Sequence, residues 1–283
     1  MVNKPLNFSL PGFIKLTRFG NLLIVALSQI FVALFFLNIH PEQYFHLGLL
    51  VISTMLIAAS GYIINDYYDV KIDYLNKPKK VVVGKIIKRR VVMVMHTLIN
   101  ALGIGLGLLL SWKVFLLNFT TALLLWLYSN QLKRLPFIGN FIVALLTSLT
   151  LLVVAIYFEN FNYKVWVFSV FAFHFSLVRE IIKDMQDLKG DSAFGCYTLP
   201  IIWGLRKTKI LLYTINVLFF IGALFIINES LSKYWFPFIF AVLLAQIVLM
   251  VKLYKADTNL HFKQLSGICK LVMLGGILSI PFL

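Results

Sequence analysis

The chain alternates long apolar runs with short polar breaks, and this pattern predicts a membrane protein built from helices. A transmembrane helix needs about 20 largely apolar residues. Nine runs meet this requirement, at residues 19–37, 47–70, 91–110, 114–131, 137–157, 163–182, 208–227, 234–254 and 265–282. The first run is too long for the apolar part of a signal peptide, and no small-residue cleavage site follows it. We therefore expect an all-α fold of nine transmembrane helices, forming a single transmembrane domain over residues 1–283.

The composition supports a membrane location. Of the 283 residues, 60% are hydrophobic and only 13% are charged, and the mean hydropathy is +0.90. These values lie far outside the range of soluble globular domains. Cys196 and Cys269 are far apart and have neither CxxC spacing nor histidine neighbours, so we expect free thiols and no thiolate metal site.

The basic residues are divided unevenly between the two predicted sides of the membrane. If the amino terminus and every second loop share one side, that side holds 23 of the 26 Lys and Arg residues, and the opposite side holds 3. Because basic loops remain in the cytoplasm, we expect a cytoplasmic amino terminus and an external carboxyl terminus. Topology and anionic lipid headgroups then account for the net charge of +15. We expect neither a nucleic acid nor a protein partner.

Two short stretches contain seven of the chain's 11 acidic residues. Each stretch has an aspartate trio with the spacing i, i+3, i+7, and these are the first acid motif (Asp66, Asp69, Asp73) and the second acid motif (Asp184, Asp187, Asp191). On a helix, this spacing places three side chains on one narrow face. Glu180 extends the second face by one turn. Like charges one turn apart destabilise a helix, so a positive group is expected between them.

Both acid motifs end predicted spans on the cytoplasmic side. Carboxylates at a membrane boundary are costly unless they are paired, hydrated or bound to a cation, which makes them functional candidates. Oxygen ligands without His or Cys favour Mg²⁺ or Ca²⁺ over zinc. Mg²⁺ is typically held by one or two carboxylates together with phosphate oxygens of a substrate. Two facing acid motifs therefore predict a site for a diphosphate bridged by Mg²⁺, with the lipid tail of the substrate among the helices beneath.

Polar and aromatic residues surround the predicted site. Asn65 lies about 100° off the face of the first acid motif, where its side chain is either a ligand or a cap. Basic residues that can bind phosphate as a group follow the first motif and end the fourth span, namely Lys77, Lys79, Lys80, Lys133 and Arg134. Aromatic rings that can stabilise a cation lie at the same end, although tyrosines are common at any membrane interface; they are Tyr62, Tyr67, Tyr68 and Tyr128.

The two acid motifs resemble those of the UbiA superfamily of intramembrane prenyltransferases. NDYYDVKID is similar to the family's first motif, NDxxDxxxD, and KDMQDLKGD to its second, DxxDxxxD. The resemblance extends over nearly the whole chain through KLTRFGN, LYSNQLKR and TLPIIWG, and LYSNQLKRLPFIGN is most similar to the branch that makes archaeal-type ether lipids. NKPKKVVVGK departs from the pattern, because many relatives carry an Arg soon after the proline. Lys79 or Lys80 would take the place of this Arg, but lysine lacks the bidentate fork with which arginine binds phosphate.

This resemblance implies a UbiA-type bundle with a cytoplasm-facing active site, in the inner membrane of a bacterial or archaeal cell. The implied reaction is an Mg²⁺-dependent transfer of a polyprenyl group, expected to be geranylgeranyl, from its diphosphate to a lipophilic acceptor, expected to be (geranylgeranyl)glyceryl phosphate. The implied metal ligands are Asn65, Asp66, Asp69, Asp73, Asp184, Asp187 and Asp191. Of these, Asp66, Asp69, Asp184 and Asp187 are expected to be catalytic. Lys77, Lys133 and Arg134 would contact the diphosphate, and Arg18, Asn21, Tyr62 and Tyr128 would line the substrate pocket.

Three other functions remain open at this point. The same chemistry can prenylate an aromatic quinone precursor. The acid motifs could instead be ion ligands of a cation transporter, although ionisable residues are almost absent from the middle of the spans, where a transport pathway needs them. A CDP-alcohol phosphotransferase also uses repeated aspartates in membrane helices, but the DGxxAR element expected of that family is missing.

Overall fold

The fold is built from helices throughout the part of the chain that the structure describes. A computed structural model describes residues 8–228 and 235–283, and every regular element in these ranges is helical apart from one isolated β-bridge between Val83 and Ile87. Nine helical segments in these ranges are long and apolar enough to cross a membrane. The predicted all-α class and the nine predicted spans are therefore confirmed, while the predicted start of the eighth span at residue 234 lies outside the described residues.

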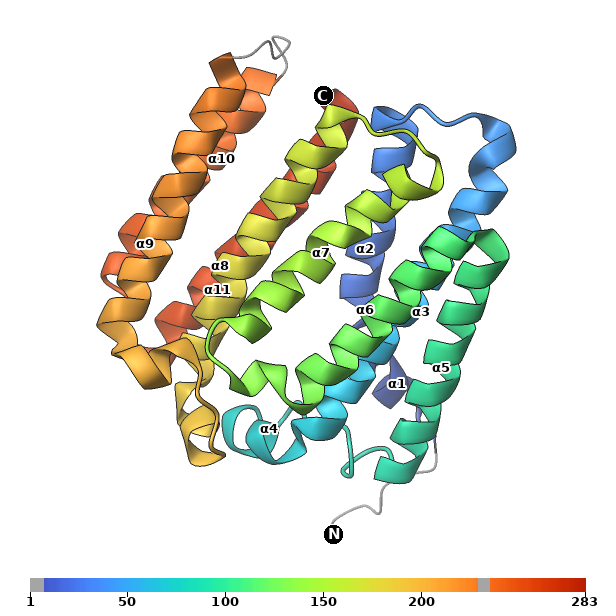
Figure 1. Ribbon diagram of the computed structural model, residues 1–283. Coiled ribbons are helices and arrows are strands. Elements are labelled where there is room, and N and C mark those ends of the chain that lie inside the picture. The colour runs from blue at the N-terminus through green and yellow to red at the C-terminus, as the bar shows by residue number, and fades with distance from the viewer. Residues whose placement is uncertain (1–7, 229–234) are drawn as a thin grey trace. The chain divides into compact units, whose positions relative to one another are not determined.

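The helices follow the apolar runs closely (Figure 1). In chain order they are α1 (Leu10–Leu16), α2 (Phe19–Phe31), α3 (Tyr44–Tyr68), α4 (Val70–Asn76), α5 (Arg89–Leu110), α6 (Trp112–Asn130), α7 (Ile138–Tyr157), α8 (Tyr163–Ala193), α9 (Leu199–Asn228), α10 (Trp235–Tyr254) and α11 (Asn259–Ser279). A π-helical turn (Val32–Phe36) prolongs α2, and short 3₁₀ turns occur at Pro41–Gln43, Leu132–Arg134 and Ile280–Phe282.

Two helices are longer than their apolar runs predicted. Helix α8 continues to Ala193 instead of ending at 182, and α9 begins at Leu199 instead of 208. Hydropathy marks where a helix leaves the apolar layer, whereas its backbone hydrogen bonds continue into the polar region. Within α9, Gly204 has φ 74° and ψ 165°, so the helix has a kink that a side chain at this position would oppose.

The chain divides into two compact units. Unit 1 comprises Met1–Arg134 and Leu149–Val165, and unit 2 comprises Leu135–Ser148 and Trp166–Leu283. The first acid motif belongs to unit 1 and the second to unit 2. The expectation of a single domain stays a prediction.

In unit 1, α3 packs against α2, α5 and α6 (Figure 1). Glycine permits the close approach of α5 to α3, because a Cβ on Gly103 would lie 2.9 Å from Cδ1 of Ile57. Buried polar groups also join the helices. The Asn118 side chain of α6 donates from Nδ2 to Oγ of Ser53 at 2.6 Å, and the Ser53 hydroxyl donates to the carbonyl of Gly103 at 2.8 Å.

Replacing Gly103 with leucine tests this packing. The new side chain would collide with Ile57, and overpacking a close contact typically costs about 1–3 kcal/mol. We therefore expect Gly103→Leu to lower the thermal unfolding midpoint in detergent by several degrees. Gly105→Leu, on the same helix, is the matched control, because a Cβ at Gly105 would meet nothing within 4 Å. An equal loss of stability in both variants would contradict the packing argument.

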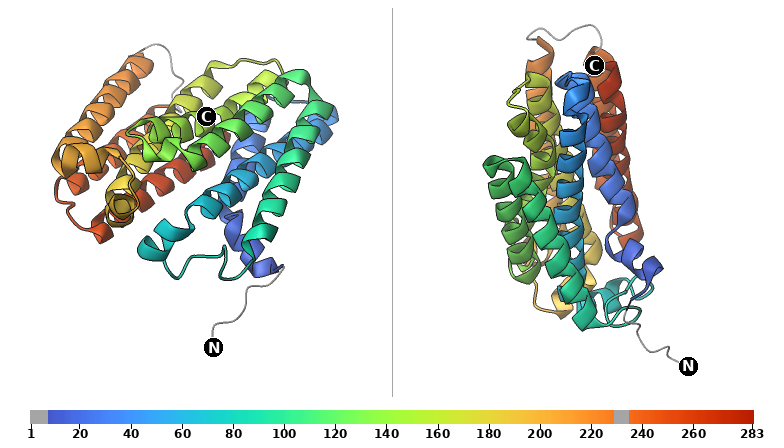
Figure 2. Two further views of the ribbon diagram at one scale, coloured as in Figure 1. Left: turned by 60° about the horizontal axis from the view of Figure 1, so that its bottom comes forward. Right: turned by 90° about the vertical axis from the view of Figure 1, so that its right-hand side faces the viewer.

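In unit 2, one face of α8 provides much of the hydrophobic core. Buried α8 residues include Val178, Ile181 and Ile182, which belong to a cluster with residues of α9, α10 and α11 such as Leu249 and Phe262. Helices α9 and α10 run side by side (Figure 2). This packing holds α8 in place up to the residues where the second acid motif begins. Both cysteines are free, as expected, and both are buried.

Candidate active site

The first acid motif lies where α3 ends and α4 begins. Asp69 has φ −84° and ψ 1° and is not part of either helix. The prediction of one unbroken helical face is therefore wrong for this motif. Asp favours caps because its side chain competes for backbone hydrogen bonds. Backbone hydrogen bonds between residues four apart nevertheless continue across the break. The Asp69 amide donates to the backbone carbonyl of Asn65 at 2.9 Å, and the Asp73 amide donates to the backbone carbonyl of Asp69 at 2.8 Å.

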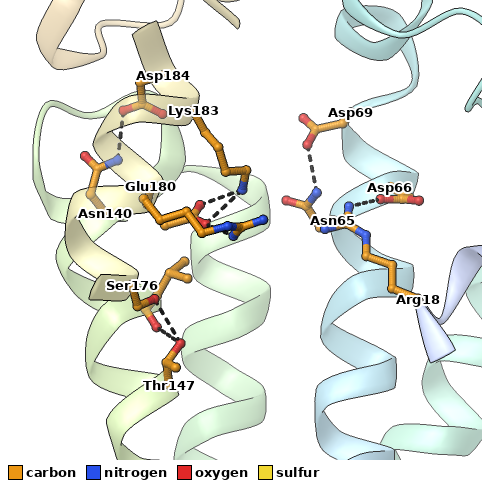
Figure 3. A network of polar contacts seen from close by, with 12 residues as sticks. Arg18, Asn65, Asp66, Asp69, Asn140, Thr147, Ser176, Glu180, Lys183 and Asp184 are labelled. Carbon is orange, nitrogen blue, oxygen red and sulfur yellow. Dashed lines mark hydrogen bonds and ion pairs between the residues drawn. The ribbon is translucent and has the colours of Figure 1, made fainter. Parts of the chain in front are cut away.

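Two basic side chains lie against the carboxylates of this motif, and Figure 3 shows the first of them, Arg18. Arg18 donates from Nη2 to Oδ1 of Asp66 at 2.7 Å. Lys133 donates from Nζ to Oδ1 of Asp69 at 2.5 Å, and this Lys133 side chain is only 10% exposed. Arg18 and Lys133 thus place positive charge beside two acids of the first motif, while a cation bound between the acids stays a prediction. The Lys133–Asp69 pair is largely buried, and because such a pair is costly to break from one side only, Lys133 strongly constrains Asp69.

Arg18 is held in an unusual backbone conformation. Its φ of 51° and ψ of 51° lie in the left-handed region, which costs a non-glycine residue roughly 1–2 kcal/mol. The guanidinium group lies 4.9 Å from the centre of the Tyr62 ring while it binds Asp66. The ion pair and the ring contact together fix Arg18 between α2 and α3, which is the region where the sequence predicted pocket residues.

Asn65 orients one carboxylate of the first motif, and Asp73 is the last aspartate of that motif. Asn65 donates from Nδ2 to Oδ2 of Asp69 at 2.9 Å (Figure 3), so its amide orients the carboxylate. Asp73 lies in α4, beyond the span. Burial, reinforced by the charge of Asp69 and opposed by Lys77, raises the pKa of Asp73 to about 6. The ionised form of Asp73 is therefore less stable than that of a solvated carboxylate, although it still predominates at neutral pH, and a bound cation would stabilise it.

The second acid motif lies on the unbroken helix α8, as predicted. Asp184 accepts a hydrogen bond of 2.8 Å from Nδ2 of Asn140 on α7 (Figure 3). Glu180, one turn earlier, accepts from Lys183 at 2.8 Å and from Arg179 at 3.1 Å. Asp184, Asp187 and Asp191 are partly exposed. Glu180 is thus neutralised by its own helix, whereas Asp184 is held by the amide of Asn140.

Four further predicted site residues, Lys77, Arg134, Asn21 and Tyr128, belong to unit 1. Lys77 caps the end of α4 and is half-buried, whereas Arg134 is exposed in the 3₁₀ turn that also contains Lys133. Asn21 in the first turns of α2 and Tyr128 near the end of α6 are partly buried. Their predicted roles stay predictions.

Sequence reasoning missed one polar partner. Asn140 follows the phrase LPFIG at the start of the fifth predicted span, where a lone asparagine resembles an ordinary packing residue. Its hydrogen bond to Asp184 links positions that are 44 residues apart. A buried amide within an apolar run is the signal that could have singled it out, because such a group needs a partner.

The donor chemistry of both motifs suits Mg²⁺. In residues 8–228 and 235–283, no group of three or more His, Cys, Asp or Glu side chains is arranged to hold a metal ion. Mg²⁺ does not require such a cage, because it usually keeps water and takes one or two carboxylates together with substrate phosphate oxygens. Partly exposed aspartates beside an amide, as at Asp66, Asp69 and Asp184, supply oxygen ligands of this kind.

These features define a class of protein: an all-α integral membrane protein with nine candidate spans in the described residues, which carries one aspartate motif at the end of the second span and another near the end of the sixth, α8. The chain belongs to the UbiA prenyltransferase family, whose profile matches residues 26–265.

Curated relatives of high coverage have one description in common. The digeranylgeranylglyceryl phosphate synthase of Saccharolobus solfataricus is 31% identical over 288 residues, which cover 97% of this chain and 99% of that protein. The enzyme of the same description from Thermococcus gammatolerans is 37% identical over 199 residues, which cover 70% of this chain and 71% of that protein.

Solved structures share the fold. A structure described as digeranylgeranylglyceryl phosphate synthase in membranes has a TM-score of 0.71 and 26% identity, with 97% of this chain and 99% of that chain covered. A UbiA homologue from Archaeoglobus fulgidus, bound to GPP and Mg²⁺, has a TM-score of 0.69 and 16% identity, with 96% and 100% covered. At this identity, the second likeness shows the fold alone.

Proposed function

We propose that this protein transfers a geranylgeranyl group from its diphosphate to (geranylgeranyl)glyceryl phosphate and so forms an ether lipid. The observation that carries the proposal is the similarity over 97% of the chain to a digeranylgeranylglyceryl phosphate synthase. The two aspartate motifs supply the chemistry that such a transfer needs. A homologue of the same fold was solved with a prenyl diphosphate and Mg²⁺, which supports Mg²⁺ as the metal.

The proposed reaction breaks the bond between the allylic carbon and the diphosphate oxygen. The acceptor hydroxyl oxygen forms the new ether bond, its proton is lost, and pyrophosphate leaves. When bound, Mg²⁺ neutralises negative charge on the leaving group. We assign its ligands to Asn65 and the aspartates of both acid motifs. Apolar helices keep water from the reacting carbon.

The bases of unit 1 have a second role in this proposal. Lys133 and Arg18 neutralise Asp69 and Asp66 in the structure, and their positive charge also suits a diphosphate. Lys77 and Arg134 would add to this charge, while Asn21, Tyr62 and Tyr128 would line the pocket. The excess of basic residues in alternate loops supports a cytoplasmic site, a cytoplasmic amino terminus and an external carboxyl terminus, in a bacterial or archaeal membrane.

Replacing Lys133 tests its proposed contact with the diphosphate. Losing a charge-assisted hydrogen bond costs about 1.5–3 kcal/mol, so we expect Lys133→Gln to lower kcat/KM for the prenyl diphosphate roughly 10- to 100-fold. Lys207→Gln is a control, because Lys207 is exposed on α9 and has no role in the proposal. Steady-state kinetics of the purified variants would check this, and unchanged kcat/KM in Lys133→Gln would remove Lys133 from the site.

An acceptor panel tests the substrate assignment. Purified protein would receive Mg²⁺, labelled geranylgeranyl diphosphate and, in separate reactions, geranylgeranylglyceryl phosphate, an aromatic acid or haem. We expect the label to appear in the glyceryl phosphate lipid. Transfer to the aromatic acid alone would replace this acceptor with a quinone precursor and leave the reaction type intact.

A further inference from the structure

Six basic side chains form an exposed cluster between α4 and the first turn of α5. This cluster, called the basic platform below, consists of Lys79, Lys80, Lys85, Lys88, Arg89 and Arg90. The sequence has no Asp or Glu between Asp73 and Glu159. Among the described residues, none of the six forms an ion pair with a carboxylate. The platform therefore has a strong uncompensated positive charge.

The platform is attached to a small hydrophobic core. Val82, Val83 and Ile87 lie between its basic residues in the sequence and are at most 3% exposed. They pack in one cluster with Leu16 of α1 and Ile63 of α3. The Gly84 amide donates to the Ile87 carbonyl at 2.8 Å and closes the turn. The buried apolar side chains thus anchor this segment and keep its basic side chains on the outer surface.

Helix α1 extends this surface with apolar side chains. Lys15 donates from Nζ to the carbonyl of Lys79 at 3.0 Å. Gly12 packs closely against Ile86, which lies between the basic residues of the platform in the sequence, because a Cβ at Gly12 would lie 3.0 Å from Cγ2 of Ile86. On the outer side of α1, Leu10 and Ile14 are 58% and 47% exposed. Exposed apolar residues beside basic ones are typical of segments that lie at a lipid interface.

We propose that the basic platform binds the phosphate-bearing headgroups of anionic membrane lipids. Uncompensated like charges repel one another, and an anionic surface relieves that repulsion. The platform directly precedes the transmembrane helix α5, so lipid headgroups are the anions that it meets at highest concentration. Leu10 and Ile14 then reach the boundary between headgroups and acyl chains. This site concerns bilayer lipids, and Lys85, Lys88 and Arg90, which carry its test, have no role in the proposed transfer reaction.

A three-residue variant tests the proposal. Lys85→Gln/Lys88→Gln/Arg90→Gln removes half of the platform's charge and spares Arg89, which lies over the Tyr67 ring at 4.4 Å, as well as Lys79 and Lys80 beside Lys77. Full-length protein in neutral detergent is titrated with phosphatidylglycerol or phosphatidylcholine, and the thermal unfolding midpoint is followed. We expect phosphatidylglycerol to stabilise the wild type where phosphatidylcholine does not. The variant should need at least about tenfold more phosphatidylglycerol for the same shift.

The matched control removes the same charge elsewhere. Lys252, Lys255 and Lys263 are exposed at and near the connection between α10 and α11, and Lys252→Gln/Lys255→Gln/Lys263→Gln should respond to phosphatidylglycerol as the wild type does. An equal loss of stabilisation by phosphatidylglycerol in this control would show a nonspecific charge effect and would overturn the proposal. A platform variant that responds like the wild type would also overturn it.

Two measurements on the wild type keep the proposal testable even if the variant does not fold. The stabilisation by phosphatidylglycerol should be largely lost at about 1 M salt, where the Debye length is about 3 Å. Inorganic phosphate at the same concentration as the lipid should give no shift. Stabilisation that persists in high salt, or that inorganic phosphate reproduces, would contradict a headgroup surface.

Discussion

Asp66→Asn and Asp184→Asn are each expected to lower the rate of prenyl transfer by about 10²–10³-fold, the loss typical of removing one preorganised electrostatic contact from an active site. Asparagine has nearly the same shape as aspartate. Its amide oxygen can still accept from Arg18 at position 66 and from Asn140 at position 184, which are the two contacts in the structure. The loss should therefore arise from the missing charge rather than from unfolding.

The rate of pyrophosphate release and the thermal unfolding midpoint would be measured on the same preparations. Asp257→Asn is a matched control, because the Asp257 side chain is 77% exposed and pairs with Lys209, away from both acid motifs in the sequence. This control should keep the wild-type rate. If Asp66→Asn and Asp184→Asn protein also turned over at the wild-type rate, neither carboxylate could be a metal ligand.

Removing divalent metal is expected to abolish transfer, and adding Mg²⁺ back should restore it. The leaving diphosphate carries several negative charges, and Arg18 and Lys133 are already paired with carboxylates. Without a metal, a bound diphosphate would place further negative charge beside the aspartates and would be repelled by them. We expect activity in EDTA to fall by more than about 10³-fold, given the several kcal/mol that metal-ion catalysis supplies.

Ca²⁺ separates the role of charge from that of geometry. It has the charge of Mg²⁺ but longer ligand distances, about 2.3–2.6 Å against 2.0–2.1 Å. We expect Ca²⁺ to restore binding of a non-hydrolysable prenyl diphosphate analogue, seen as thermal stabilisation, while turnover stays low. Full activity in EDTA would contradict the assignment of the acid motifs as metal ligands.

Much of this architecture could be predicted from hydrophobic patterning because the bilayer imposes it. A span must be long and apolar, so nine runs predicted nine helices. The ends of α8 and α9 could not be predicted in the same way, since hydropathy reports the apolar layer and the helical backbone extends beyond it. The interruption at Asp69 also has no signal in the i, i+3, i+7 spacing, which is the same in both motifs.

The acid motifs were visible in the sequence because carboxylates are rare in this chain. Their partners were only partly visible. Arg18 is 48 residues from Asp66, and Asn140 is a single amide in an apolar run, so neither pairing follows from local spacing. Lys133 was predicted for the site as one of several basic residues at a helix end, and its contact with Asp69 depends on how α3 and α6 pack.

The central claim is that this protein releases pyrophosphate from an isoprenyl diphosphate as it forms an ether lipid. The most direct test measures both products in one reaction, with purified protein, Mg²⁺, labelled geranylgeranyl diphosphate and geranylgeranylglyceryl phosphate. We predict that one pyrophosphate is released for each labelled lipid formed. This claim would be contradicted by the absence of both products, together with cation uptake into proteoliposomes that requires no isoprenyl diphosphate and is abolished by Asp66→Asn.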